Sequence, residues 1–222
     1  MIKLKINQRY YDVNQYPDRC PHCRHAIKAE VVLSAINSAE DIIDIVFSCP
    51  RYECLRISIA VYVRNTTSLV ETLMGYRLRY LHPMNPIDPI FSPHVAKVSP
   101  QYVEIFKQAS KAEAFDLGEI AGVGYRKALE FLVKDYCITK NPDKEEEIKA
   151  KFLGRVIDNH VDNVNIKQCA KRAVWLGNDE THYVRVWVEK DIKDLKLLIQ
   201  LTVGWIEQEI LTEILMKDMQ QG

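Results

Sequence analysis

Lys-Arg-Ala-Val-Trp-Leu-Gly-Asn-Asp-Glu-Thr-His-Tyr, residues 171–183, lies between two helical patterns and gathers polar side chains into one short span. Gly177 suits a helix end, because glycine accepts positive φ without strain, and Asn178 would then cap the next turn with its side-chain oxygen. If the segment instead stays helical, Asn178 and His182 are four residues apart and share a face. Both alternatives predict a polar junction. The local sequence favours a structural role for this junction, as a helix–helix corner in which His182 hydrogen-bonds to a backbone carbonyl.

Helical periodicity extends on both sides of this stretch, from residue 99 to the end of the chain. Apolar residues recur there with a period near 3.6, and Ser99-Pro100 marks a helix start, because proline is tolerated at the first helical position. We predict helices at residues 99–112, 116–136, 145–159, 165–176 and 189–220. Together they form an all-α bundle over residues 99–222.

The last of these helices is apolar over more than one stripe. Leu197, Leu201, Trp205 and Leu211 widen the surface beyond the residues needed to face a single core. Such a helix lies at a bundle centre or at a subunit interface. We therefore predict a homodimer with the final helix in its interface.

The first part of the chain has a period of two, which predicts strands. Alternating apolar residues indicate strands at residues 2–12, 26–36, 41–47 and 55–64. Residues 75–81 also alternate, whereas residues 68–74 could form a short helix. Five prolines between residues 82 and 100 make regular structure there unfavourable. We expect a β-rich domain at residues 1–82, a Pro-rich linker at 83–98 and the helical bundle at 99–222.

Two close cysteine pairs interrupt the predicted strands. Cys20 and Cys23 are separated by two residues, and Cys49 and Cys54 by four, and each pair adjoins a proline. Two such knuckles separated by strands are typical of a zinc ribbon, in which four thiolates close a tetrahedral site. We expect one structural Zn²⁺ held by these four residues; the alternative is a set of free cysteines at strand ends.

Composition and segment lengths limit the class of protein. Lys and Arg total 30 against 30 Asp and Glu, which argues against bulk electrostatic binding to nucleic acid. The N-terminal residues lack the pattern of a signal peptide, and the most apolar run, residues 195–206, is too short to span a bilayer. We expect a cytoplasmic protein without a membrane partner.

Two short motifs in the helical half resemble a known family. They are Arg126-Lys-Ala-Leu-Glu130 within one predicted helix and Gly177-Asn178-x3-His182 before the last helix. This combination is similar to domain-of-unknown-function family 4145, which is allied with the HEPN superfamily of helical domains. The resemblance covers about residues 99–215, and zinc knuckles with a Pro-rich linker fit the longer family members.

The resemblance implies a HEPN-like helical domain, which in many relatives is a metal-independent RNase or a nucleotide-binding module. Such domains are often dimers and occur in toxins and phage-defence systems. Their catalytic pattern is Arg-x4–6-His. In this chain nine residues separate Arg172 from His182, and Val174 stands where relatives often place an arginine.

The predicted fold class is α+β, with an N-terminal β-rich zinc ribbon followed by an all-α HEPN-like bundle. The predicted function is a non-catalytic interaction module linked to nucleic-acid or defence systems. The alternative is an RNase, with RNA or a nucleotide as partner. His182 would then be the general base on a ribose hydroxyl, Arg172 or Arg126 would stabilise phosphate charge, and Asn178 would orient the phosphate.

Overall fold

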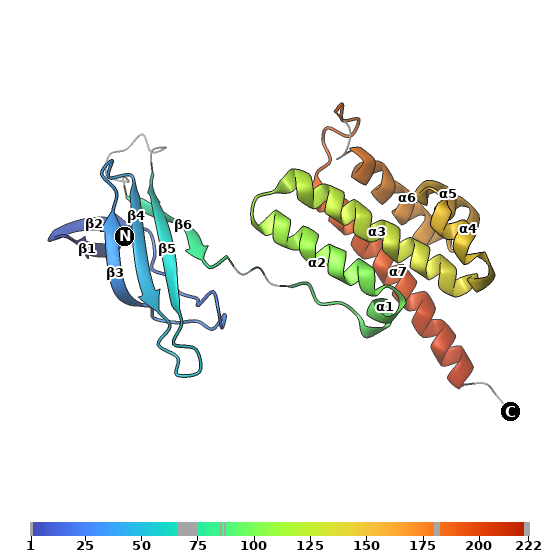
Figure 1. Ribbon diagram of the computed structural model, residues 1–222, viewed down its shortest axis with the longest axis horizontal. Helices are drawn as coiled ribbons and strands as arrows, with labels where there is room; N and C mark the ends of the chain where they lie inside the picture. The colour runs from blue at the N-terminus through green and yellow to red at the C-terminus, as the bar shows by residue number, and fades with distance from the viewer. Residues whose placement is uncertain (1, 66–74, 85, 87, 180–182, 220–222) are drawn as a thin grey trace. The chain divides into compact units, whose positions relative to one another are not determined.

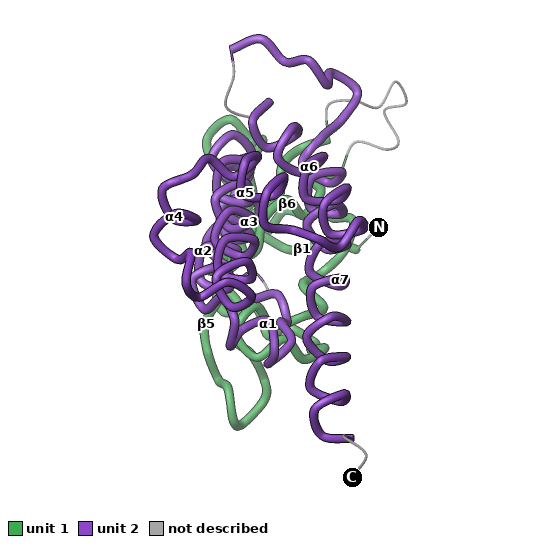
Figure 2. The backbone as a smooth tube through the Cα atoms, turned by 90° about the vertical axis from the view of Figure 1, so that its right-hand side faces the viewer, with its two compact units in different colours: residues 1–85 green, residues 86–222 purple. Residues whose placement is uncertain are grey.

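The computed structural model describes residues 2–65, 75–84, 86, 88–179 and 183–219, in two compact units (Figure 1, Figure 2). Unit 1 comprises Met1–Asn85 and unit 2 comprises Pro86–Gly222. Each unit buries a hydrophobic cluster of its own. Among the described residues, no helix combines the length and the apolar character needed to cross a membrane.

Unit 1 is built on one six-stranded mixed sheet (Figure 1). Its strands are β1 (Ile2–Ile6), β2 (Arg9–Val13), β3 (Glu30–Ile36), β4 (Ile42–Ser48), β5 (Ile57–Arg64) and β6 (Tyr76–His82). The spatial order is β1-β2-β6-β5-β4-β3, and only the β2–β6 pair of this sheet is parallel. The outer strands β1 and β3 approach each other, so the sheet curls toward a barrel.

The sheet encloses the core of unit 1 on its concave side. Residues of one parity along β4 and β5 are buried, as the alternation of a half-buried strand requires. Phe47 and Tyr62 are the largest fully buried side chains of this core. The Tyr62 hydroxyl donates a hydrogen bond to the carbonyl oxygen of Gln15 at 2.9 Å, so its polar end is satisfied.

The prediction of a zinc ribbon for residues 1–82 is wrong. The chain does combine strands with helices, but β1, β2 and β6 join the strands between the cysteine pairs in a single sheet. The resulting core contains nine buried residues from five strands. A zinc ribbon has too little apolar surface for such a core and depends on its metal instead.

The segment predicted as a single strand at residues 2–12 is a hairpin. Asn7 and Gln8 connect β1 to β2, with φ angles of 47° and 69°. Positive φ at both loop residues is the requirement of a type I′ turn, whose twist suits a two-residue hairpin. The predicted strand at 75–81 corresponds to β6, whereas residues 68–74 fall in a part of the chain that the structure does not describe.

Unit 2 is helical throughout its described regular structure. Its helices are α1 (Pro93–Val98), α2 (Pro100–Ala114), α3 (Gly118–Lys140), α4 (Glu145–Ala150), α5 (Leu153–His160), α6 (Val164–Asp179) and α7 (Ile192–Asp218), with a 3₁₀ turn at Pro142–Lys144. Helix α3 is central, because it packs against α2, α5, α6 and α7. Gly124 lets α2 approach closely, since a Cβ there would lie 2.9 Å from Ala109 Cβ.

Two predicted boundaries in unit 2 are wrong. The Pro-rich linker contains α1, which Ser92 caps by accepting a hydrogen bond from the His94 amide at 3.2 Å. The single helix predicted at residues 145–159 is divided into α4 and α5, because Lys151 and Phe152 both adopt extended backbone angles. Ser99 caps α2 in the same way as Ser92 caps α1, with the proline at N1 that the sequence predicts.

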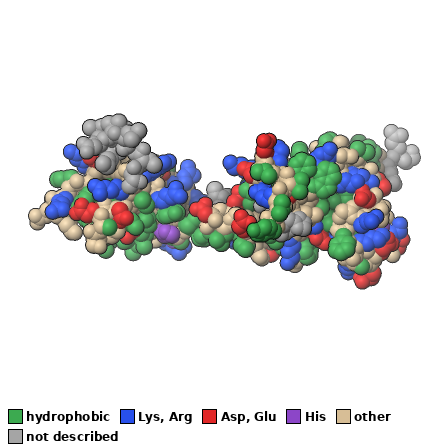
Figure 3. All heavy atoms as spheres, turned by 90° about the horizontal axis from the view of Figure 1, so that it is seen from above, with side chains coloured by type: hydrophobic (Ala, Val, Ile, Leu, Met, Phe, Trp, Pro, Cys, Tyr) green, Lys and Arg blue, Asp and Glu red, His purple; other side chains and the backbone are tan. Residues whose placement is uncertain are grey.

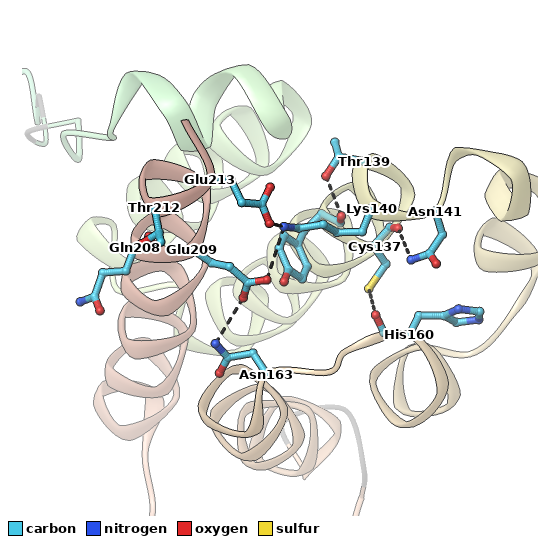
Figure 4. A network of polar contacts seen from close by, with 11 residues as sticks. Cys137, Thr139, Lys140, Asn141, His160, Asn163, Gln208, Glu209, Thr212 and Glu213 are labelled. Carbon is cyan, nitrogen blue, oxygen red and sulfur yellow. Dashed lines mark hydrogen bonds and ion pairs between the residues drawn. The ribbon is translucent and has the colours of Figure 1, made fainter. Parts of the chain in front are cut away.

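A network of ion pairs and hydrogen bonds connects the C-terminal end of α3 to α7 (Figure 4). Lys140 forms ion pairs with Glu213 and, at 3.4 Å, with Glu209. Asn163 Nδ2, just before α6, donates a hydrogen bond to Glu209 at 3.2 Å. Three segments distant in sequence thus converge on the Glu209 carboxylate.

Candidate functional site

The four cysteines predicted as metal ligands lie together in unit 1. The Sγ atoms of Cys20, Cys23, Cys49 and Cys54 all lie within 4.8 Å of one another. The Cys20–Cys54 and Cys23–Cys49 sulfur pairs are both 3.8 Å apart. That separation is too long for a disulfide. It equals the edge of a tetrahedron with metal–sulfur bonds of about 2.3 Å, the usual zinc–thiolate length.

The two cysteine loops have the same construction. In each, the amide of the first cysteine closes the loop, from Cys20 to the His25 carbonyl and from Cys49 to the Arg56 carbonyl, both at 3.0 Å. In each, the residue after the second cysteine has a left-handed backbone, with φ 63° at Arg24 and 47° at Leu55. This repeated geometry turns both thiols of a loop toward the same point.

The thiols of the cluster differ in acidity. Burial disfavours the Cys20 thiolate, but backbone N–H groups of Cys23 and His22 outweigh it and lower the Cys20 pKa to about 7. Burial and the neighbouring thiols raise the Cys49 pKa to about 12. A bound cation would supply the positive charge that allows all four groups to ionise. The donor set therefore fits a thiolate-binding metal ion.

The histidines beside the first loop contact backbone atoms. His22 Nε2 lies 3.1 Å from the Ile57 carbonyl oxygen, and His25 Nδ1 lies 2.9 Å from that of Cys23. Cys137 and Cys169 belong to unit 2, where Cys137 is buried and donates to the His160 carbonyl at 3.6 Å. Within the described part of the chain, the metal-binding group thus consists of the four clustered cysteines.

A second polar cluster joins α3 to α6 in unit 2. Arg126 Nε donates to Asn178 Oδ1 at 3.0 Å, and Arg126 Nη1 pairs with Glu130 Oε2 at 3.0 Å. Lys134 Nζ pairs with the other Glu130 oxygen at 2.8 Å. The Arg126 and Lys134 side chains are only 18% and 16% exposed, whereas the Glu130 side chain between them is 33% exposed, so the cluster is partly shielded from solvent.

The charges of this cluster stabilise the Glu130 carboxylate. Burial alone would raise the Glu130 pKa, but the hydrogen bonds from Lys134 and Arg126 outweigh it and lower that pKa. Lys134 is not among the residues singled out from the sequence. Its i, i+4 spacing from Glu130 is the signal that predicts this pair.

Gly177 lies inside α6, so the prediction of a helix end at this residue is wrong. Helix α6 continues through Asn178 to Asp179. Glycine is required for packing, because a Cβ at position 177 would lie 2.6 Å from Cδ and 2.8 Å from Cβ of Arg126. Arg126 therefore crosses α6 at Gly177 and meets the amide of the next residue.

The remaining predicted site residues are not all assembled around this cluster. Arg172 also lies on α6, but its Nη1 donates to the carbonyl and the side-chain oxygen of Gln168, and its guanidinium lies over Trp175. His182 lies outside the described residues. The structure therefore brings together Arg126, Glu130 and Asn178.

Comparisons with known proteins found no match to this chain. A scan against protein-family models gave no match, and neither did searches of the curated proteins and of the solved structures.

Proposed function

We propose that the chain is a zinc-binding, non-catalytic interaction module. The observation that carries this proposal is the four-sulfur cluster, in which two sulfur pairs lie at the tetrahedral-edge distance of 3.8 Å and all four atoms lie within 4.8 Å of one another. Four thiolates complete the coordination of zinc and leave no position for a substrate, so the metal has a structural role. It holds the two cysteine loops together at one end of the sheet.

Elemental analysis of protein purified without chelator tests the metal. We expect one zinc per chain in the parent and none in the Cys20→Ser, Cys49→Ser double variant. Cys137→Ser is the matched control, because Cys137 lies in unit 2, and it should keep full zinc content. Tetrahedral thiolate sites also take iron. A metal-free parent, or one iron per chain with visible absorption, would contradict the proposal.

The interaction role is supported by helix α7. The last turns of this helix extend beyond the other helices of unit 2 (Figure 1). Leu215 is 55% exposed, Leu201 is 44% exposed and Ile214 is 37% exposed. Exposed apolar surface of this extent is typical of protein–protein contacts. We propose that a second copy of the chain covers it.

The helical unit carries no broad field of one charge sign on the face seen in Figure 3, where acidic and basic side chains are interspersed. This distribution agrees with the balanced totals of 30 basic and 30 acidic residues. A binding partner recognised mainly by charge is therefore disfavoured. A nucleic-acid-related or defence role rests on the motif resemblance alone.

A metal-independent RNase is the second candidate, favoured by one observation. Arg126 reaches Asn178 at 3.0 Å, so an arginine lies beside the motif that ends at His182. In this hypothesis His182 is the general base, Arg126 stabilises phosphate charge and Asn178 orients the phosphate.

Incubation with total RNA separates the two candidates. If the module is non-catalytic, RNA stays intact and His182→Ala lowers the melting temperature, because the sequence predicts a hydrogen bond from His182 and losing a hydrogen-bonded side chain typically costs about 1–3 kcal/mol. If the protein is an RNase, His182→Ala and Arg126→Gln abolish cleavage, and His182→Ala leaves melting unchanged. Arg155→Gln, an exposed arginine on α5, is the control and should behave as the parent.

A further inference from the structure

A cavity of about 320 Å³ lies in unit 2 between α6, the start of α7 and the segment before it. Its apolar lining comes from Trp175, Leu176, Trp187, Leu197 and Leu198. Its charged lining residues are Arg172, Lys190 and Asp194. The volume falls in the range of small-molecule pockets, and the mixture of apolar wall and few polar groups is typical of them.

Asp179 holds one wall of this cavity in place. Its carboxylate accepts hydrogen bonds from the backbone amides of Val186 at 2.7 Å and Trp187 at 2.9 Å. The amide of Val186 above all keeps the Asp179 pKa below its usual range. An acid at the last residue of a helix opposes the helix dipole. The two amides explain why an aspartate stands there, and their bonds fix the backbone of Trp187.

Trp187 is thereby placed parallel to Trp175, which lies one turn before Asp179 on α6. The two ring planes are 4° apart in angle, and the ring centroids are 6.4 Å apart. Tryptophans that serve only the core would be expected to bury most of their surface. Here Trp175 is 49% exposed and Trp187 is 43% exposed, and both line the cavity.

The charged residues around the tryptophans determine which sign of ligand charge the cavity favours. The Arg172 guanidinium lies 5.9 Å from the Trp175 ring centroid. Lys190 forms an ion pair with Asp194 at 3.1 Å, so the three charged lining residues carry a net charge of +1. An aromatic cage for a cation would be opposed by the arginine already over its ring. An anionic group is favoured beside Arg172.

We propose that this cavity binds a small molecule with a planar aromatic ring and an anionic substituent. The ring stacks against Trp175 and Trp187, and the anionic group pairs with Arg172. Asp179 acts as a positioning residue through Trp187. Mononucleotides and aromatic carboxylates share this chemistry. The proposal depends neither on the metal centre nor on RNA cleavage.

Tryptophan fluorescence measures binding directly. The chain has three tryptophans, so a Trp205→Phe variant leaves Trp175 and Trp187 as the reporters. It is titrated with AMP and with nicotinate, and with adenosine and inorganic phosphate as comparisons. We expect saturable quenching by AMP or by nicotinate, and the arm that responds identifies the source. Adenosine should bind about tenfold more weakly than AMP, and phosphate alone should cause no quenching.

Variants test each part of the site. Trp187→Ala should weaken binding about tenfold or more, the usual effect of losing one stacked aromatic ring. Arg172→Gln should weaken binding of the anionic ligand and leave adenosine unchanged. Asp179→Asn should weaken binding and also increase quenching of Trp187 by acrylamide, because the hydrogen bonds that hold the backbone of Val186 and Trp187 would be weakened.

Lys193→Gln is the matched charge control, because Lys193 is exposed on the first turn of α7 and does not line the cavity. It should bind as the parent does. Calorimetry repeats each titration independently of fluorescence. The proposal is overturned if neither AMP nor nicotinate saturates the site at millimolar concentration, or if Trp187→Ala and Arg172→Gln both bind as tightly as the parent.

Discussion

The absence of a side chain at position 177 allows the Arg126 side chain to cross α6. The sequence suggests a helix end at Gly177, because glycine is common there. The structure gives a different reason, since the aliphatic part of Arg126 occupies the space that a Cβ would need. No pattern within the local sequence contains that information, because the arginine comes from a helix about fifty residues earlier.

We expect Gly177→Ala to destabilise unit 2. The added Cβ would lie 2.8 Å from the Arg126 Cβ, which cannot move without its helix. Overpacking of this kind costs about 1–3 kcal/mol, more than the gain of about 1 kcal/mol from replacing glycine within a helix. Chemical denaturation should show a net loss of about 1 kcal/mol.

Gly154→Ala on α5 is the matched control, because nothing lies within 4 Å of a Cβ built there. It should leave stability unchanged or raise it slightly. Equal stability of the two variants would show that α6 and α3 are not in close contact at Gly177.

The half-buried Glu130 should make stability depend on pH. Its pKa is lowered in the folded state, so its ion pairs contribute stability above the unfolded pKa, about 4.3, and this contribution is lost as pH falls through the lower folded value. The free energy of unfolding should therefore fall more steeply below about pH 4.5 in the parent than in Glu130→Gln. The two curves should converge in acid. Glu119→Gln, exposed on the first turn of α3, should follow the parent.

At the scale of elements, the periodicity of apolar residues predicts most of the strands and helices. Alternation locates the strands that correspond to β3, β4, β5 and β6, and the 3.6-residue period locates α2, α3, α6 and α7. The β1–β2 hairpin is missed because Asn7-Gln8 contains no glycine to mark a turn. The break between α4 and α5 is missed because extended angles at Lys151 and Phe152 carry no Pro or Gly signal.

The candidate sites are also predictable to different degrees, because some depend on local spacing and others on packing between distant segments. Cysteine spacing is a local property, and it selects the four residues that the structure brings within 4.8 Å. Pairing of Arg126 with Glu130 also follows from spacing. The contact with Asn178 and the parallel tryptophans depend on packing between segments, which spacing does not report.

If the four cysteines hold the proposed zinc, its removal should loosen the cysteine loops and leave the sheet folded. The nine-residue core of unit 1 contains none of the four cysteines. After treatment with a chelator, hydrogen exchange should accelerate about tenfold or more in residues 17–26 and 49–56, while β4 and β5 remain protected. The same treatment should not change the Cys20→Ser, Cys49→Ser variant further. Loss of protection throughout unit 1 would mean that the metal, and not the core, maintains the sheet.

For the whole molecule, the exposed face of α7 predicts self-association. Light scattering should give twice the chain mass of 25.7 kDa at micromolar concentration. Leu201→Glu together with Leu215→Glu should weaken the dimer at least about tenfold, because each places a charge in an apolar interface. Ile120→Glu, on an exposed position of α3, is the control. A monomer mass at every accessible concentration would refute the dimer.

The parallel pairing of β2 with β6 means that the β1–β2 hairpin can join the sheet through this pair only after β6 has been synthesised. The β1–β2 hairpin is synthesised first, but its neighbour in the sheet, β6, ends only at His82. Both cysteine loops are complete by residue 56, so four thiols can meet a metal ion while the nascent sheet still lacks its central strand. Alkylation of cysteines in chains truncated before Tyr76 would report this early protection. The metal would then assist folding by joining the two cysteine loops next to β4 and β5 before the β1–β2 hairpin can pair with β6.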